Sequence, residues 1–313
     1  MIVTVCLNPA LDQTTTLAAL KPGAVHRALA ARTDPGGKGI NVSKTIAALG
    51  GSSLAMAFCG GFAGQQLQAM VQALGIRTDF IRVSGETRTN TKIFDVSTGE
   101  TTDINQAGPV IGRTELDLFA ARLFAHVVPG DTVVLAGSLP QGVPDDLYNQ
   151  WIVRLKEKGV RVLLDADGDR LKSALPAKPD VIKPNLQELL DILPAQACEG
   201  MSPLSCAVLA AHQLIDQGIS LVVISQGADG ATMVSAEGVM RLPGLAIKPK
   251  SSVGAGDAMV AALAYGLDRG LPMEQTYALS LATSAAAAMT EGTQPAPRAL
   301  VDSLLSEVQM HRL

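Results

Sequence analysis

Cysteine and aromatic residues are scarce in this chain of 313 residues, which has four cysteines and 3% aromatic residues. No Cys-x-x-Cys pair occurs, so the sequence predicts neither a zinc site nor a disulfide framework, and the cysteines are expected to be buried free thiols. The four histidines form no metal-ligand spacing either, which argues against a metalloenzyme. The cysteines are Cys6, Cys59, Cys198 and Cys206.

Charged residues are also few, at 17% of the chain, and they nearly balance to a formal net charge of −4. No lysine and arginine cluster could neutralise a row of phosphates, so a nucleic-acid partner is not expected. The apolar stretches 258–267 and 277–289 fall short of the roughly 20 residues that a membrane span needs. The N-terminus resembles no signal peptide. The sequence therefore predicts a cytoplasmic protein with no membrane partner.

Several catalytic motifs are missing as well. There is no Gly-x-x-x-x-Gly-Lys-Ser/Thr, which excludes a P-loop ATPase, and no Gly-x-Gly-x-x-Gly after the first expected strand, which leaves a nicotinamide dehydrogenase unsupported. The segment 137–140, Gly-Ser-Leu-Pro, lacks the glycine pattern of a nucleophile elbow, so a hydrolase is not indicated.

Short apolar runs rich in β-branched residues alternate with segments of helical periodicity along most of the chain. Uninterrupted apolar runs are typical of strands that helices cover on both faces, as in parallel sheets. The expected fold class is therefore α/β, a doubly wound, mostly parallel sheet with helices on both faces, in one domain spanning 1–313. Strands are expected at 54–58, 132–135, 160–164, 181–182 and 221–224, and helices at 65–74, 115–127, 144–158, 203–217, 255–269, 273–290 and 297–309.

Two stretches, at about 12–34 and 87–107, alternate polar and apolar side chains without a helix between. A period of two predicts antiparallel strands with one covered face. Both stretches leave the main sheet and return to it, so we expect them to form one small β-sheet, a lid over a site at the strand ends. The edges and faces of a small exposed sheet need covering, which favours a homodimer through the lid.

The segment 251–260 carries the strongest indication of chemistry, since small residues follow a strand and lead into a helix. Bare N–H groups and the positive end of the helix dipole meet at such a start and attract anions. Gly254, Ala255 and Gly256 would let a phosphate approach, and Asp257 could take a proton from an attacking hydroxyl. The same residues also fit an ordinary helix N-terminus with an acidic dipole partner.

Two further segments are ambiguous when taken alone. The glycine-rich loop at 35–44 places an amide and the lysine Lys38 beside bare N–H groups, which suits a polyhydroxylated ligand, but its glycines could simply turn the chain. The motif at 183–188 sets Asn185 and Glu188 at the start of a helix, where they could hold a hydrated magnesium ion. An Asn followed three residues later by Glu is equally typical of a helix cap.

Taken in order, these motifs resemble the ribokinase-like sugar kinases, and within them the phosphofructokinase B branch, over nearly the whole chain. The resemblance implies phosphoryl transfer from ATP to a small sugar phosphate. The motifs that carry it are Leu-Asn-Pro-Ala-Leu-Asp at 7–12, Gly-Gly-Lys-Gly-Ile-Asn-Val at 36–42, Thr-Arg-x-Asn at 87–90, Gly-Ser-Leu-Pro at 137–140, Lys-Pro-Asn-x-x-Glu at 183–188 and Val-Gly-Ala-Gly-Asp at 253–257.

The resemblance also implies roles for single residues. Asp257 would be the base that accepts the proton of the sugar hydroxyl, and the N–H groups of Gly254, Ala255 and Gly256 would form the anion hole. Residues implied to hold the sugar phosphate are Asp12, Gly37, Lys38, Asn41, Arg88, Asn90, Lys92 and Ser138, with Arg27 as a further candidate for its phosphate. Those implied for ATP are Lys183, Asn185, Ser225, Gly227, Gly230 and Ser252, and those for Mg²⁺ are Asn185 and Glu188.

The sequence departs mildly from the branch at Ala136, Gln226 and Ser252, and at 165–168 Asp-Ala-Asp-Gly replaces a commoner Asp-x-Ser/Thr-Gly. These changes put local nucleotide contacts in doubt rather than the activity. The lid segments resemble enzymes that act on fructose 1-phosphate, which we therefore expect as the substrate. Tagatose 6-phosphate and fructose 6-phosphate remain open alternatives, and a sensor that binds without turnover is the alternative of another class.

Overall fold

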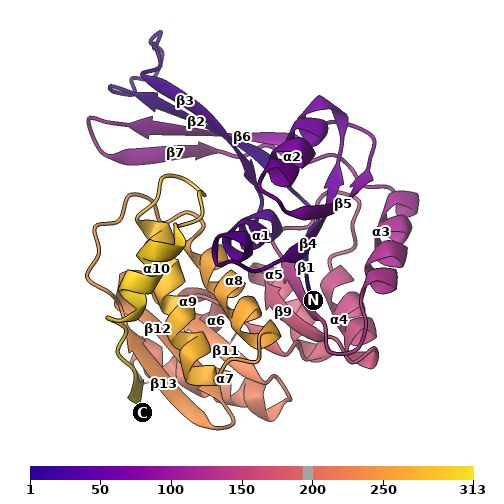
Figure 1. Ribbon diagram of the computed structural model, residues 1–313, viewed down its shortest axis with the longest axis vertical. Helices are drawn as coiled ribbons and strands as arrows, with labels where there is room; N and C mark the ends of the chain where they lie inside the picture. The colour runs from indigo at the N-terminus through magenta and orange to yellow at the C-terminus, as the bar shows by residue number, and fades with distance from the viewer. Residues whose placement is uncertain (193–199) are drawn as a thin grey trace.

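The computed structural model describes residues 1–192 and 200–313, which form an α/β layered structure with a projecting small sheet (Figure 1). The main sheet has ten strands in the order β14-β13-β12-β11-β10-β9-β8-β1-β4-β5 among the described residues. Its strands are β1 (Ile2–Cys6), β4 (Ser53–Cys59), β5 (Arg77–Arg82), β8 (Thr132–Ala136), β9 (Arg161–Asp165), β10 (Val181–Ile182), β11 (Leu221–Ser225), β12 (Gly230–Ser235), β13 (Gly238–Pro243) and β14 (His311–Arg312).

All neighbours from β5 to β11 pair in parallel, while β12, β13 and β14 are added antiparallel at one edge. The prediction of a mostly parallel sheet is confirmed. Strand β1 is followed in the sheet by β4 on one side and by β8 on the other, so the winding reverses between β1 and β8. In doubly wound sheets, ligands bind outside the carboxyl ends of the strands at this reversal.

Helices cover both faces of the sheet, which confirms the predicted class. Side chains alternate between the faces along each strand, because successive residues of a strand point to opposite sides. One face carries α1 (Lys38–Ala48), α2 (Gly61–Ala73), α8 (Ala255–Asp268), α9 (Met273–Ala288) and α10 (Arg298–Leu305); the other carries α3 (Arg113–His126), α4 (Leu147–Glu157), α5 (Gly168–Ala174), α6 (Leu186–Leu190) and α7 (Pro203–Asp216), with short 3-10 turns at η1 (Leu175–Ala177) and η3 (Gly227–Asp229).

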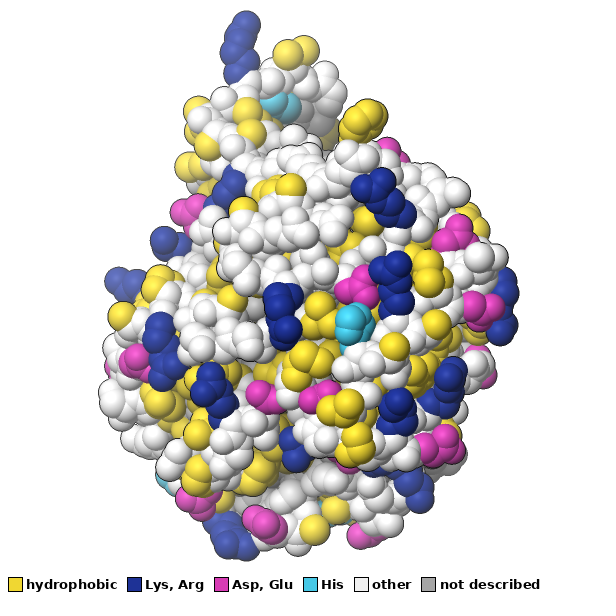
Figure 2. Space-filling view, turned by 45° about the vertical axis from the view of Figure 1, so that its right-hand side comes forward, with side chains coloured by type: hydrophobic (Ala, Val, Ile, Leu, Met, Phe, Trp, Pro, Cys, Tyr) yellow, Lys and Arg dark blue, Asp and Glu magenta, His cyan; other side chains and the backbone are white. Residues whose placement is uncertain are grey.

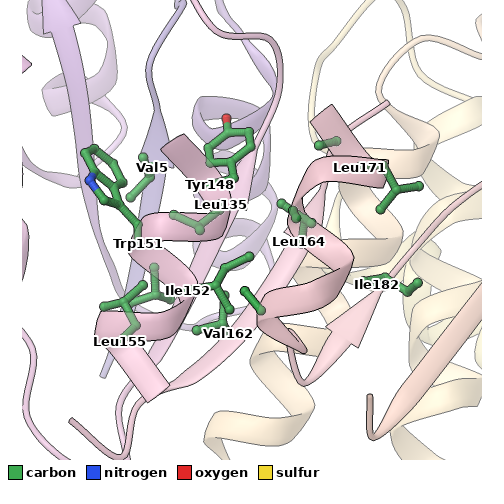
Figure 3. Close-up of a cluster of buried hydrophobic side chains, with 14 of the residues drawn as sticks. Val5, Leu135, Tyr148, Trp151, Ile152, Leu155, Val162, Leu164, Leu171 and Ile182 are labelled. Carbon is green, nitrogen blue, oxygen red and sulfur yellow. The ribbon is translucent and has the colours of Figure 1, made fainter. Parts of the chain in front are cut away.

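The core under α3 to α7 is the larger of the apolar layers, and Figure 3 shows its centre. There Val5, Leu135 and Leu164 from three parallel strands meet Tyr148 and Ile152 from α4, and all five are buried. Half of the aromatic residues cluster here, with Phe119 and Trp151 stacked at 5.5 Å between ring centroids. A layer of this kind fixes the strand ends rigidly and so positions the loops that follow them.

The lid is a separate four-stranded sheet that projects from the body of the molecule (Figure 1). Its strands are β2 (Ala10–Leu17), β3 (Ala30–Gly36), β6 (Arg88–Asp95) and β7 (Glu100–Ile104), in the order β3-β2-β6-β7. Each predicted stretch forms an antiparallel hairpin, but the hairpins join through a parallel pair, β2 with β6, in which Ala10 lies opposite Arg88. The small sheet is thus confirmed, while the expectation of antiparallel strands throughout is wrong.

Two other expectations concern the cysteines and the apolar helices. Cys6 and Cys59 are buried free thiols as expected, but Cys206 is disulfide-bonded, so the expectation is wrong there; Cys198 lies outside the described residues. Within 1–192 and 200–313, no helix has both the length and the apolar character that crossing a bilayer requires.

The aromatic cluster provides a test of this core. Phe119→Ala should lower the free energy of unfolding by about 3–5 kcal/mol, because a fully buried ring is removed from contact with Phe58 and Trp151. Its neighbour Leu118 is 43% exposed on the same helix, so Leu118→Ala should cost less than about 1 kcal/mol. Urea denaturation of both variants measures the difference, and equal losses would contradict the assigned packing.

Candidate active site

A cavity of about 410 Å³ opens at the carboxyl ends of the strands, at the reversal between β1 and β8 and beneath the lid. Asn8 follows β1, and Gly137 and Ser138 follow β8 at its wall. All eight residues that the sequence assigns to the sugar phosphate line it, together with two of the four that it assigns to catalysis. They are Asp12, Gly37, Lys38, Asn41, Arg88, Asn90, Lys92 and Ser138, with Gly254 and Asp257.

The start of α8 forms one wall of the cavity. Gly254 caps the helix with a φ of 84°, a left-handed conformation that glycine adopts at no steric cost. The turn directs the first N–H groups of the helix and its positive dipole end toward the cavity region. The Ala255 N–H makes only a long contact, 3.4 Å, to Ser252 O. This end of the helix is therefore suited to receive an anionic group.

Asp257 lies in the first turn of α8 and is buried. Burial raises the pKa of its carboxyl to about 6, and the neighbouring Asp165 adds to the rise. The Asn41 amide, which donates from Nδ2 to Asp257 Oδ2 at 2.8 Å, opposes this shift together with Lys38 and Lys183. The result is a carboxylate that is ionised at neutral pH and yet more basic than an exposed aspartate.

Asp165 is a site residue to which the sequence analysis assigned no role. It ends β9, is buried, and lies between two ammonium groups, 3.3 Å from Lys38 Nζ and 3.4 Å from Lys183 Nζ. Burial alone would raise the pKa of Asp165, but Lys183 and Lys38 hold it below its usual value. The sequence offered one indication of this role, since Asp165 is an acidic residue at the end of a buried parallel strand, at the edge of the sheet where the other motifs lie.

The first turn of α1 approaches the end of β1 very closely. Gly37 has a φ of 102°, and a Cβ placed there would lie 2.6 Å from Cys6 Sγ and 3.0 Å from Pro9 Cα. No side chain fits without moving β1 or the loop that follows it. The glycine therefore allows Lys38 and Asn41 to enter the cavity from the start of α1, beside the strand ends.

The lid supplies the opposite wall of the cavity. Asn90 donates from Nδ2 to Asp12 Oδ1 at 3.0 Å, and Arg88 donates to Asn8 O at 2.9 Å. Three buried polar atoms here have no partner among the described residues: Asn8 Oδ1, Arg88 Nε and Asn90 Oδ1. Buried groups of this kind are normally satisfied, so their unmet bonds indicate a polar ligand. Lys92 is already paired, at 2.8 Å, with Asp103 Oδ1, and Arg27 lies exposed in the lid tip outside the cavity lining.

None of the residues that the sequence assigns to the nucleotide and the metal lines this cavity, although Lys183 lies close to it. Lys183 follows β10, and its Nζ lies 3.2 Å from where a Cβ on Gly256 would stand, so it borders the start of α8. Asn185 bridges to Ser225 at the ends of β10 and β11, and Gly227 and Gly230 bound the turn that follows. These residues form a second group beside the first.

Asn185 and Glu188 form a reciprocal capping box at the start of α6. Asn185 Oδ1 accepts from Glu188 N, and Glu188 Oε2 accepts from Asn185 N, both at 2.8 Å. The cap that the sequence left open as an alternative is thus present. Glu188 keeps a second carboxylate oxygen, and Mg²⁺ is commonly held by one or two carboxylates while it retains several waters. The pair therefore fits a hydrated ion, and the metal role stays a prediction.

The arrangement of the site indicates a class of protein. A doubly wound sheet, a lid with polar groups, and a buried carboxylate at a helix N-terminus together describe a small-molecule kinase, since phosphoryl transfer needs positioning, a base and charge neutralisation. The chain belongs to the pfkB family of carbohydrate kinases, whose model matches residues 7–299.

Relatives cover nearly the whole chain. A 1-phosphofructokinase of Xanthomonas campestris pv. campestris is 43% identical over 289 residues, which are 90% of this chain and 89% of that protein. A 1-phosphofructokinase of Bacillus subtilis is 35% identical over 315 residues and covers both chains fully. Among solved structures, phosphofructokinase-2 from Escherichia coli in complex with substrates and products has a TM-score of 0.92 at 28% identity over 98% of each chain. The predicted family is confirmed.

The raised pKa of Asp257 predicts a cost to stability. Its ionised form is disfavoured in the folded state, so its contribution is fully favourable below the unfolded value of 3.8 and is lost as the pH rises through about 6. Asp257→Asn, which stays neutral, should therefore raise the free energy of unfolding by roughly 1–3 kcal/mol at pH 8, at about 1.4 kcal/mol per pKa unit.

Urea denaturation at pH 8 and near pH 4 measures this effect, and the gain should be absent at the lower pH. Asp117 is exposed and paired within α3, so Asp117→Asn is the control that should change stability little at pH 8. If Asp257→Asn is no more stable than the wild type at pH 8, the ionised carboxylate does not destabilise the folded state.

Proposed function

We propose that this protein is a cytoplasmic 1-phosphofructokinase that transfers the γ-phosphoryl group of ATP to fructose 1-phosphate, giving fructose 1,6-bisphosphate. The observation that carries the proposal is a single cavity in which Asp257 and the start of α8 lie opposite the polar groups of the lid. The names of the relatives, several of which are 1-phosphofructokinases, support the choice of substrate. The membership in the pfkB family supports the choice of reaction.

In the proposed reaction, Asp257 is the general base. The free hydroxyl of the sugar attacks the γ-phosphorus, its proton passes to the Asp257 carboxylate, and the bond from that phosphorus to the bridging oxygen of ADP breaks. A pKa of about 6 suits the role, because the group is ionised at neutral pH and still accepts a proton readily. N–H groups at the start of α8, from Gly254 to Gly256, would stabilise charge on the transferred group.

The sugar phosphate would lie between the lid and the start of α1. Asp12, held by Asn90, would offer carboxylate oxygens to sugar hydroxyls, and Gly37 and Asn41 line the same cavity. Arg88, whose Nε is buried without a partner among the described residues, is the best placed cation for the phosphate already on the substrate. Lys38 is held by Asp165 and would serve the phosphate in transfer or the sugar.

ATP would lie along the ends of β10 and β11, where Lys183, Asn185 and Ser225 follow the strands. The family resemblance assigns Gly227, Gly230 and Ser252 to the same nucleotide. Magnesium held near Asn185 and Glu188 would neutralise charge on the nucleotide phosphates. Lys183 links the two groups of residues, since it contacts Asp165 and borders α8.

We further propose a homodimer formed through the lid. Val25, Leu29, Val96 and Ile104 are all more than half exposed on it, and Figure 2 shows hydrophobic side chains on the projecting part of the molecule. Apolar groups gathered on a small sheet favour a covering partner. Elsewhere on the face in Figure 2, acidic and basic side chains are interspersed, which gives no support for a nucleic-acid partner.

An assay of ADP release with fructose 1-phosphate, tagatose 6-phosphate, fructose 6-phosphate and fructose tests the proposal. We expect kcat/KM to be highest for fructose 1-phosphate, and Asp257→Asn to lower kcat by about 10²- to 10⁴-fold while it still binds the sugar phosphate. A higher kcat/KM for another ketose phosphate would contradict fructose 1-phosphate as the substrate and assign that other sugar phosphate instead. Binding without turnover in the wild type would favour the sensor.

A second prediction concerns the lid. Arg88→Ala should raise the KM for the sugar phosphate at least tenfold and leave the KM for ATP within about twofold, because a charge-assisted hydrogen bond contributes about 1.5–3 kcal/mol. Arg82 is an exposed cation at the end of β5, outside the cavity lining, and Arg82→Ala should change neither constant. Equal effects of Arg88→Ala on both KM values would remove this residue from the sugar site.

A further inference from the structure

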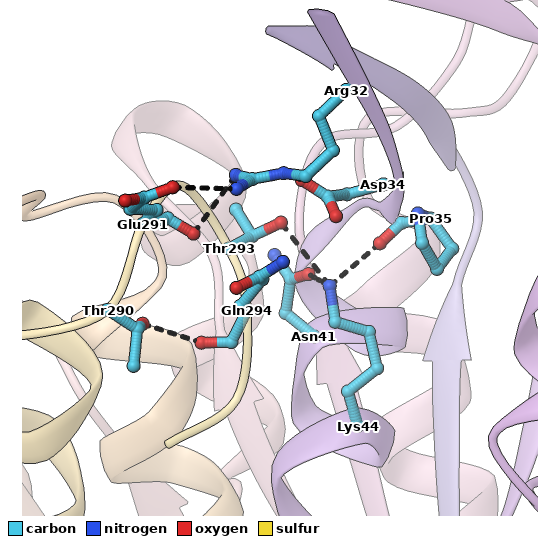
Figure 4. A network of polar contacts seen from close by, with 9 residues as sticks. All are labelled: Arg32, Asp34, Pro35, Asn41, Lys44, Thr290, Glu291, Thr293 and Gln294. Atoms are coloured by element: carbon cyan, nitrogen blue, oxygen red, sulfur yellow. Dashed lines mark hydrogen bonds and ion pairs between the residues drawn. The ribbon is translucent and has the colours of Figure 1, made fainter. Parts of the chain in front are cut away.

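Lys44 is a buried lysine that the proposed reaction does not use. It lies on α1, is 3% exposed, and its Nζ donates to three acceptors: Pro35 O at 2.8 Å, Asn41 Oδ1 at 2.9 Å and Thr293 Oγ1 at 3.3 Å. Figure 4 shows this ammonium at the centre of a network between strand β3, helix α1 and the loop after α9. One charged group thus ties three segments that surround the cavity.

The contact with Asn41 decides which way that amide faces. A side-chain amide has an acceptor oxygen at one end and donor N–H groups at the other. Because the Lys44 ammonium can only donate, it fixes Asn41 Oδ1 on its own side, which leaves Nδ2 to donate to Asp257 Oδ2 at 2.8 Å. An amide turned over would set oxygen against carboxylate and N–H groups against ammonium, two repulsive contacts in place of two attractive ones.

We propose that Lys44 is a positioning residue of the reaction, which holds the Asn41 amide in the orientation that donates a hydrogen bond to the Asp257 carboxylate at the cavity. The inference rests on the proposed role of Asp257 as the base. Thr293 lines the same cavity, so the ammonium also fixes a wall segment that faces the substrate region. Lys44 itself does not line the cavity and acts through Asn41.

The energetic cost of this lysine supports a specific role. Burial and the nearby Arg32 lower the pKa of Lys44 to about 8, against the opposing attraction of Asp34, Asp12 and Asp257. A buried charge is expensive, and replacement of such a group by an apolar one often stabilises a protein. Arg32 is itself held by Asp34 and by Glu291 on the loop after α9, which brings that loop against Lys44 (Figure 4).

The groups that face Asp257 come from several elements, so the effect of Lys44 can be separated from theirs. Asp165 from β9 raises the pKa of Asp257, while Lys38 on α1 and Lys183 after β10 lower it. The donated hydrogen bond from Asn41 also lowers it. If Lys44 no longer fixes Asn41, this bond is weakened, the pKa of Asp257 rises, and the acid limb of the kcat profile moves to higher pH.

The test combines Lys44→Met with Asn41→Ala in a double-mutant cycle, assayed with ATP and the best ketose phosphate. We expect Lys44→Met to lower kcat about 10- to 100-fold with the KM for ATP within about twofold, and to shift the acid limb upward. In the Asn41→Ala background the same substitution should have a clearly smaller effect, since only the direct attraction between the Lys44 ammonium and Asp257 and the contact with Thr293 remain to be lost. Additive losses with an unmoved acid limb would overturn the proposal.

Ser43→Ala is the matched control. Ser43 is fully buried one residue earlier on α1, and its Oγ contacts Thr4 Oγ1 at 2.7 Å and Ser53 Oγ at 2.8 Å, away from the cavity. It should weaken the fold without moving the acid limb or kcat. If Lys44→Met does not fold, Lys44→Arg replaces it: a longer cation should lower kcat in the wild type and change it little in Asn41→Ala, and an equal loss in both would contradict the role.

A measurement without turnover separates this inference from the proposed function. In the wild type, the side-chain N–H signals of Asn41 should be shifted by the Asp257 carboxylate and should respond to its titration in NMR spectra. In Lys44→Met that response should shrink. An unchanged Asn41 response in Lys44→Met would contradict the positioning role even if Asp257 proves to be the base. A smaller response in Lys44→Met together with normal turnover in Asp257→Asn would contradict only the reaction assigned to Asp257.

Discussion

The buried carboxylate of Asp257 is the constraint to which the rest of the site responds. Removal from water and a nearby second carboxylate push its pKa upward, and the net value is about 6. Without the groups that oppose this rise, the pKa would be higher, and less of the carboxyl would be ionised and able to accept a proton at physiological pH. Those groups are one amide and two lysines, from α1 and from the loop after β10. The site therefore needs several segments in fixed register, which a loop alone could not provide.

The winding of the sheet provides that register. Parallel strands all end at the same edge, so the residues that follow β1, β8, β9 and β10 meet there although they are far apart in the sequence. The reversal between β1 and β8 leaves a crevice that no crossover helix fills. The apolar layers on both faces hold the strand ends rigid, and the glycine at position 37 lets α1 close against β1. Packing thus converts sequence order into a constellation of side chains.

The sequence predicted the strands that a local pattern of residues identifies, but it did not predict strand pairing or contacts between distant side chains. Continuous apolar runs located β4, β8, β9, β10 and β11 to within a residue or so, and the cavity residues were implied by the family resemblance that the motifs carry. Alternation of polar and apolar residues indicates that one face of a strand is covered, but it does not identify the neighbouring strand. The parallel pairing of β2 with β6 was therefore not predictable. Asp165 and Lys44 are buried, and each contacts a residue more than a hundred positions away in the sequence. Periodicity does not reveal such contacts.

Buried polar atoms under the lid that lack hydrogen-bond partners bear on which ligands the site selects. Each buried atom without a partner costs about 1–3 kcal/mol, and Asn8, Arg88 and Asn90 each present one among the described residues. A ligand with hydroxyl and phosphate oxygens at matching positions would recover this energy on binding, whereas an analogue that lacks one such group would leave it unrecovered. Sites of this kind reject a deoxygenated analogue far more strongly than an apolar pocket rejects an added methylene. In the proposed reaction, the polar groups under the lid therefore favour a sugar phosphate, rather than a small apolar alcohol, as the acceptor that reaches Asp257.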